Sequence, residues 1–154
     1  MLTLLHADDF IVAIHKPSGL LVHRSAIDRH ETENAMAALR NQIGRRVYPV
    51  HRLDKPVSGV LLFALSPEIA RTLTQTFERG HISKRYHALV RGHCNHQGQI
   101  DYPLKEALDP RTDSRANPDK PPQPAITRWR CLGTCELPLP VGRYPTARYS
   151  LLSI

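Results

Sequence analysis

The stretch HRLDKPVSGVLLFALS, residues 51–66, sets one carboxylate, Asp54, shortly before a continuous apolar run. A run of this length predicts a strand that is buried on both faces. Asp54 lies among the cations Arg52 and Lys55, and nearby opposite charges favour the ionised form of a carboxyl group. An anionic Asp in a turn acts as a nucleophile or a base, or it is a structural turn residue paired with a cation. The local chemistry alone favours the structural alternative.

The composition bounds the class of protein. The chain has 154 residues and a hydrophobic content of 41%, which suits one compact domain over residues 1–154. Its 21 Lys and Arg residues exceed its 14 Asp and Glu residues, so the formal net charge is +7. A positive surface favours polyanions, which makes nucleic acid the leading partner class. Basic surfaces also occur on proteins that bind no nucleic acid, so the positions of the charges must decide.

The sequence predicts a cytoplasmic protein without a membrane partner. The short apolar start is interrupted by His6, Asp8 and Asp9, so we expect no secretory signal. No span is long and apolar enough to cross a membrane. The three cysteines lack the spacing of a disulfide framework, which indicates thiols in a reducing compartment.

The first half of the chain carries signals for a hairpin and a helix. Two short apolar runs around Asp8 and Asp9 predict a β-hairpin. A helix is expected over residues 32–44, with Thr32 as its cap and Gly44 at its end. The segment KPSGLLVH between them is expected to be a loop.

The later segments predict one more helix and several strands. Ser66 can cap the helix, Pro67 suits its first position, and Gly80 follows its last turn. The segment SKRYHALVRG alternates two sets of side chains, one of them largely basic, which predicts a strand. Further strands are predicted in AITRWRCLG and ARYSLLSI. The Pro-rich and charged residues 105–124 before them predict a long surface loop.

The positive charge follows the ends and faces of the predicted strands. Lys and Arg in such positions grip a nucleic-acid backbone, and an Arg can reach into a base stack. Tyr86 shares a predicted strand with Lys84, and a ring beside a cation suits stacking on an extruded base. A Tyr on a strand is more often typical of half-buried packing. The cations concerned are Arg52, Lys55, Lys84, Arg85 and Arg91.

The sequence gives less support for a metal site, a serine hydrolase site or a phosphate-binding loop. His93, Cys94 and His96 are of metal-ligand types, but no second pair completes a zinc pattern. The sequence contains no Gly-x-Ser-x-Gly elbow of a serine hydrolase and no glycine-rich phosphate loop. A small metalloprotein stays an alternative, and we expect no bound metal.

The segments KPSGLLVH, HRLDKPVSGVLLFALS and SKRYHALVRG, in this order, resemble the motifs of RluA-type RNA pseudouridine synthases. The motif around that family's catalytic acid reads approximately His-Arg-Leu-Asp, followed shortly by Thr or Ser, Gly and an apolar strand. Asp54 takes the place of the acid. The resemblance runs from Leu2 to Leu152. It implies an α+β catalytic domain whose mixed, largely antiparallel sheet is flanked by helices.

The segments PPQPAITRWR and VGRYPTARYSLL resemble a branch of the family that modifies the uridine at position 65 of certain tRNAs. The resemblance implies an isomerase that cuts the N-glycosidic bond, turns the uracil and rejoins it through carbon, without a cofactor. We expect the protein to be a monomer. It implies Asp54 as the catalytic carboxylate, which attacks the sugar or removes a sugar proton. Arg52 would fill the gap left by the flipped nucleotide, and Tyr86 would stack on the uracil. Roles in RNA binding or in support of the motif fall to His51, Lys16, Lys84, Arg85 and Lys55.

One departure from the family pattern concerns the C-terminal end. Family members continue into a segment approximately Thr-Gly-Arg-x-His-Gln-Ile-Arg, which brings a basic residue to the catalytic Asp and completes the sheet. This chain ends at Ile154 within an apolar run. We therefore expect an incomplete domain, in which Asp54 lacks an electrostatic partner, apolar sheet surface is exposed and turnover is low. An RNA-binding remnant without catalysis stays an alternative.

Overall fold

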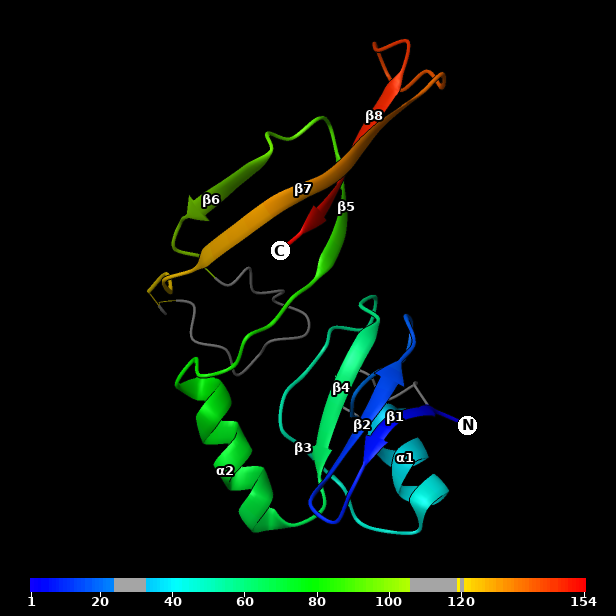
Figure 1. Ribbon diagram of the computed structural model, residues 1–154, viewed down its shortest axis with the longest axis vertical. Helices are drawn as coiled ribbons and strands as arrows, with labels where there is room; N and C mark the ends of the chain where they lie inside the picture. Colours follow the sequence, from blue (N-terminus) through cyan, green and yellow to red (C-terminus); the bar gives the residue numbers. More distant parts are fainter. Residues whose placement is uncertain (24–32, 106–118, 120) are drawn as a thin grey trace. The chain divides into compact units, whose positions relative to one another are not determined.

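The computed structural model describes four parts of the chain, residues 1–23, 33–105, 119 and 121–154. These residues divide into two compact units, Met1–Ser83 and Lys84–Ile154 (Figure 1). Each unit contains a four-stranded sheet in which every pair of neighbouring strands is antiparallel. The predicted α+β class is confirmed, but the described strands form two sheets where the sequence predicted one. The expectation of a single domain stays a prediction.

The sheet of the first unit has the strand order β1-β2-β4-β3. Its strands are β1 (Thr3–Ala7), β2 (Ile11–Lys16), β3 (Tyr48–Pro49) and β4 (Gly59–Ala64). β1 and β2 form the predicted hairpin. The carboxylate of Asp8 holds its turn, because Oδ1 accepts hydrogen bonds from the amides of Phe10 and Ile11, each at 2.8 Å.

The helix α1 (Ala35–Ile43) begins and ends through local side-chain signals. The side chain of Asn34 caps it and accepts a hydrogen bond from the amide of Ala37 at 2.9 Å. The predicted cap, Thr32, lies outside the described residues. Gly44 ends the helix as predicted, with a φ of 67° that glycine adopts without strain.

The helix α2 (Pro67–Glu78) begins as the sequence predicts. The hydroxyl of Ser66 accepts a hydrogen bond from the amide of Ile69 at 3.3 Å, and Pro67 occupies the first turn. None of its residues is fully buried, so α2 packs against the sheet through half-buried side chains and exposes the others. Among the described residues, no helix has the length and apolarity needed to cross a membrane.

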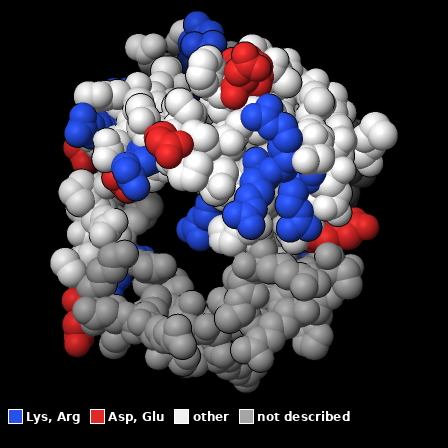
Figure 2. All heavy atoms as spheres, turned by 90° about the horizontal axis from the view of Figure 1, so that it is seen from below, with Lys and Arg blue, Asp and Glu red and all other residues white. Residues whose placement is uncertain are grey.

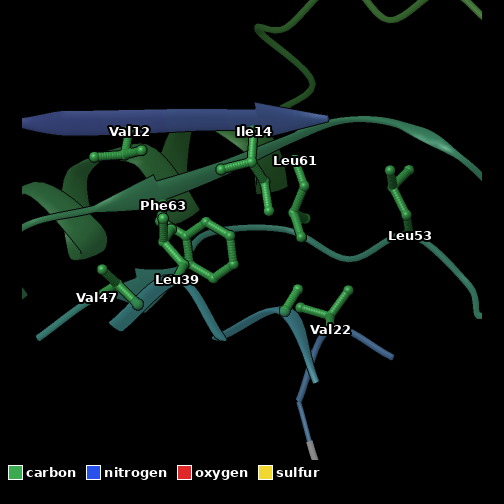
Figure 3. Close-up of a cluster of buried hydrophobic side chains, with 9 residues drawn as sticks. Val12, Ile14, Val22, Leu39, Val47, Leu53, Leu61 and Phe63 are labelled. Carbon is green, nitrogen blue, oxygen red and sulfur yellow. The ribbon is translucent and has the colours of Figure 1, made fainter. Parts of the chain in front are cut away.

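The core of the first unit forms between the sheet and α1 (Figure 3). β4 is buried less completely than predicted, because Leu61 and Phe63 are fully buried while Val60 is 60% exposed. One face of this strand therefore meets the core and the other is partly open. The buried cluster comprises Val12, Ile14, Val22, Ala35, Leu39, Val47, Leu53, Leu61 and Phe63.

The sheet of the second unit has the order β5-β8-β7-β6. Its strands are β5 (His87–Arg91), β6 (Gln97–Asp101), β7 (Ile126–Leu137) and β8 (Ala147–Ser153). β5 and β8 fall within predicted strands, although β5 begins three residues after Lys84, and β7 continues four residues beyond the strand predicted over residues 125–133. Residues 106–118 and 120 of the predicted loop lie outside the described residues. Leu89 and Leu151 oppose each other across β5 and β8, and both are exposed.

Candidate active site

The HRLD residues lie in a loop between β3 and β4, which we call the Asp54 loop (residues 51–57). Leu53 is buried in the core cluster (Figure 3). Arg52 and Asp54 on either side of it are exposed. Leu53 therefore anchors the loop and leaves both charged side chains at the surface. The amide of Val57 donates to the carbonyl oxygen of Asp54 at 2.9 Å, which closes a turn directly after the carboxylate residue.

The buried ammonium of Lys16, the last residue of β2, supports this loop. Lys16 is 0% exposed. Its Nζ donates to the carbonyl oxygens of Leu20 at 2.7 Å, Pro17 at 3.1 Å and Lys55 at 3.3 Å. The bond to Lys55 joins the ammonium to the residue that follows Asp54. This burial favours the supporting role of Lys16 over a direct contact with RNA.

The residues after Lys16 add two further contacts to the Asp54 loop. The hydroxyl of Ser18 donates to the carbonyl oxygen of Pro56 at 2.7 Å. The amide of Gly19 donates to the carbonyl oxygen of Lys55 at 2.8 Å. Gly19 has a φ of 87°, which a residue with a side chain rarely adopts. Neither Ser18 nor Gly19 was singled out from the sequence, although both lie in the KPSG segment that carried the family resemblance.

His51 fixes the beginning of the loop. Its Nε2 accepts a hydrogen bond from the amide of Leu62 in β4 at 3.1 Å. Its ring also stacks on Phe77 of α2, with ring centroids 4.8 Å apart and an angle of 22° between the planes. The imidazole therefore joins the Asp54 loop to both a strand and a helix.

The electrostatics of the site centre on Lys16 and Asp54. Burial lowers the pKa of the Lys16 ammonium, because a charged group loses its hydration in the interior. The negative charge of Asp54 acts in the opposite direction and raises the pKa of Lys16. A buried positive charge therefore lies within electrostatic range of the candidate catalytic carboxylate.

The remaining candidate residues belong to the second unit. Lys84, Arg85 and Tyr86 precede β5 and are exposed. The backbones of Tyr86 and Ile154 exchange two hydrogen bonds of 2.8 Å, which extend the pairing of β5 with β8. Tyr86 is therefore held at the end of a sheet with its side chain accessible. The proximity of Tyr86 to Asp54 stays a prediction.

Two of the residues considered as metal ligands, His93 and Cys94, contact neighbouring residues of the second unit. The amide of Cys94 donates to the hydroxyl of Ser150 at 2.9 Å, and His93 Nε2 lies 3.4 Å from the carbonyl oxygen of Cys135. Across residues 1–23, 33–105, 119 and 121–154, no three side chains of His, Cys, Asp or Glu gather as a metal site requires. The metalloprotein alternative thus has no ligand set in this part of the chain.

Comparison with known proteins identifies the family. Residues 10–154 match the model of a family described as RNA pseudouridylate synthase. The chain belongs to this family, and its resemblance to RluA-type pseudouridine synthases is confirmed.

The chain also matches curated relatives over its full length. It is 54% identical over 154 residues to tRNA pseudouridine synthase C of Pectobacterium carotovorum subsp. carotovorum, of which it covers 41%. It is 53% identical over 154 residues to tRNA pseudouridine synthase C of Haemophilus influenzae, of which it covers 64%. The chain thus spans about half the length of these relatives.

Two solved human structures share the fold. RNA Pseudouridylate Synthase Domain Containing 1 has a TM-score of 0.69 and 20% identity, and the match covers 99% of this chain and 59% of that one. RNA Pseudouridylate Synthase Domain Containing 4 has a TM-score of 0.62 and 23% identity, and the match covers 98% of this chain and 58% of that one. These similarities confirm the predicted fold class.

Proposed function

We propose that the chain is the part of a tRNA pseudouridine synthase that carries its catalytic carboxylate, Asp54. Family membership and the two tRNA pseudouridine synthase C relatives support this class of reaction. The observation that carries the proposal is the exposed carboxylate of Asp54 between two residues that are held, Leu53 and Lys55. Leu53 is buried in the core, and the carbonyl oxygen of Lys55 accepts hydrogen bonds from Lys16 and Gly19. Such a carboxylate is free to meet a substrate while its backbone stays in place.

The chemistry of the reaction explains why one carboxylate suffices. A glycosidase uses two carboxyl groups, one of them protonated, to transfer the sugar to water. An isomerase instead rejoins the detached uracil to the same sugar, so Asp54 attacks the sugar or removes a sugar proton. The bonds broken and formed balance without a net oxidation or reduction, so no cofactor is required.

The neighbouring residues fit a flipped nucleotide. A uridine within a folded tRNA must leave its stack, at a cost of about a few kcal/mol, before a side chain reaches its ribose. We assign the exposed guanidinium of Arg52, two residues before Asp54, to the gap that the nucleotide leaves. Tyr86 then stacks on the uracil and keeps it from water while it turns.

The charge of the chain suits a tRNA partner. The formal net charge is +7, and Figure 2 shows Lys and Arg side chains gathered on the displayed face. We assign the exposed side chains of Lys55, Lys84 and Arg85 to phosphate contacts. A tRNA substrate places the proposed reaction in the cytoplasm, and we propose that a monomer performs it.

The second candidate function is RNA binding without catalysis. It is favoured by the formal net charge of +7, which suits a polyanion whether or not a reaction follows binding. In this alternative the basic surface holds tRNA, but the site needs further residues for turnover. Binding would then be sensitive to salt, because phosphate contacts release counterions.

Mapping of pseudouridine in tRNA separates these functions. The tRNA is incubated with the wild type, with Asp54→Asn and with Asp9→Asn, which changes an exposed Asp of the β1–β2 turn as a matched control. We expect product from the wild type and from Asp9→Asn and none from Asp54→Asn. Product from Asp54→Asn would remove the carboxylate from its role. Salt-sensitive binding without product in all three would favour the binding alternative.

A further inference from the structure

The hydrogen bond between His51 and Leu62 lies just beyond the point where the pairing of β3 with β4 ends. β3 pairs with β4 only at Tyr48 and Pro49, and Pro49 opposes Phe63. The neighbouring amide of β4, that of Leu62, donates to Nε2 of His51 at 3.1 Å. A side chain of the Asp54 loop thus satisfies a backbone donor at the edge of the sheet.

This contact fixes the protonation state of the imidazole. A ring nitrogen that accepts a hydrogen bond carries no proton, and both nitrogens of an imidazolium are donors. His51 is therefore neutral when it accepts from Leu62, and its proton is on Nδ1. The two ring nitrogens have distinct roles, which the tautomer sets.

The stack on Phe77 fixes the plane of the same ring. The centroid distance of 4.8 Å and the angle of 22° between the planes lie in the range of offset aromatic pairs. The hydrogen bond sets the direction of Nε2 and the stack sets the tilt of the ring. Together they leave the side chain of His51 little freedom, three residues before Asp54.

We propose that His51 is a positioning residue, neutral and protonated on Nδ1, that holds the backbone of the Asp54 loop against β4 and α2. Its imidazole acts through the loop and does not touch the RNA. The inference rests on the proposed function only for its effect on turnover. The positioning itself is a property of the free protein and is measured there.

The first test needs no substitution. Long-range proton–nitrogen NMR spectra of the wild-type chain near neutral pH report which nitrogen of His51 carries the proton. We expect a protonated Nδ1 and an unprotonated Nε2. A proton on Nε2 would overturn the proposal, because that nitrogen could not then accept from Leu62.

Two variants distinguish the contribution of the hydrogen-bond acceptor of His51 from that of its aromatic ring. His51→Phe keeps an aromatic ring for Phe77 and removes the acceptor, whereas His51→Gln removes the ring and keeps an oxygen that can accept from Leu62. The exposed His81→Gln is the control. We expect exchange of the Leu62 amide to be at least about tenfold faster in His51→Phe than in the wild type, with a smaller change in His51→Gln and none in the control.

The amide of Val57 reports on the loop itself, because it donates to the carbonyl oxygen of Asp54. We expect it to exchange faster in His51→Phe as well, while amides within β2 keep wild-type rates. Unchanged exchange at both Leu62 and Val57 would overturn the positioning role. Faster exchange throughout the first unit would overturn it too, because it would show a general structural role.

Pseudouridine formation then measures the consequence for turnover. We expect His51→Phe to lower kcat about tenfold or more with little change in KM for tRNA, and His51→Gln to recover part of the loss. A raised KM with unchanged kcat would indicate RNA contact and overturn the proposal. If the wild-type chain forms no product, the proposed function fails, and the tautomer and the exchange rates still decide the role of His51.

Discussion

Removal of the buried ammonium of Lys16 tests how the Asp54 loop is held. Lys16→Met keeps most of the aliphatic stem and deletes three hydrogen bonds, to Leu20 at 2.7 Å, to Pro17 at 3.1 Å and to Lys55 at 3.3 Å. A hydrogen bond to a charged group contributes about 1.5–3 kcal/mol, and the two longer bonds contribute less than the shortest. Relief of the cost of burying a charge offsets part of this sum. We expect a net loss of about 2 kcal/mol in the free energy of unfolding.

Urea denaturation near neutral pH measures this loss. Lys105→Met makes the same chemical change at an exposed position and should alter the free energy of unfolding by less than about 0.5 kcal/mol. Pseudouridine formation by Lys16→Met should fall as well, because the Asp54 loop loses the hydrogen bond from Lys16 to the carbonyl oxygen of Lys55. A variant as stable as the wild type would refute the reasoning, because burial of the charge would then cost as much as its bonds contribute.

The difference in the free energy of unfolding between the wild type and Lys16→Met should change with pH in a defined direction. Burial lowers the pKa of Lys16 from its ordinary value of 10.5, so at alkaline pH the folded state binds fewer protons there than the unfolded state. Stability rises with pH wherever the unfolded state binds more protons. The wild type should therefore gain stability relative to Lys16→Met as the pH rises through the folded pKa towards 10.5. A gain by the variant instead would contradict this sign.

Two further predictions concern the hairpin and the second sheet. The hydrogen bond from His6 and two backbone amides lower the pKa of Asp8 from 3.8 to about 2. The stability advantage of the wild type over Asp8→Asn should persist above pH 3.8 and disappear as the pH falls through about 2, which denaturation at a series of pH values measures. In the second sheet, a methyl group on Gly98 would overlap the ring of Trp129, which opposes it across β6 and β7. Gly98→Ala should therefore cost about 1–3 kcal/mol by urea denaturation followed through Trp fluorescence, and a neutral effect would contradict this contact.

Local signals in the sequence predict the ends of helices and turns. Ser66 and Gly44 take their predicted places, because a cap depends on the side chain and the backbone within a few residues. The hairpin around Asp8 follows for the same reason. The short strand β3 and the division into two sheets have no such local signal, because they depend on partners far along the chain.

The burial of Lys16 and the contacts of His51 show what the sequence does not predict. Lys is mostly a surface residue, so a single sequence favours exposure. The available signal is the alternation of Val12, Ile14 and Lys16, which places the three side chains on one face of β2. The contacts of His51 with Leu62 and Phe77 join residues 11 and 26 positions further along the chain, which no local pattern predicts.

The central claim is that the carboxylate of Asp54 acts in the chemical step and not in tRNA binding. Single-turnover pseudouridine formation and the Kd for tRNA, measured on the same preparations of wild type and Asp54→Asn, test it most directly. The account predicts a Kd within about threefold of the wild type and a rate at least about a thousandfold lower, which corresponds to about 4 kcal/mol in the barrier. A similar rate in both proteins, or a loss of binding as large as the loss of rate, would contradict it.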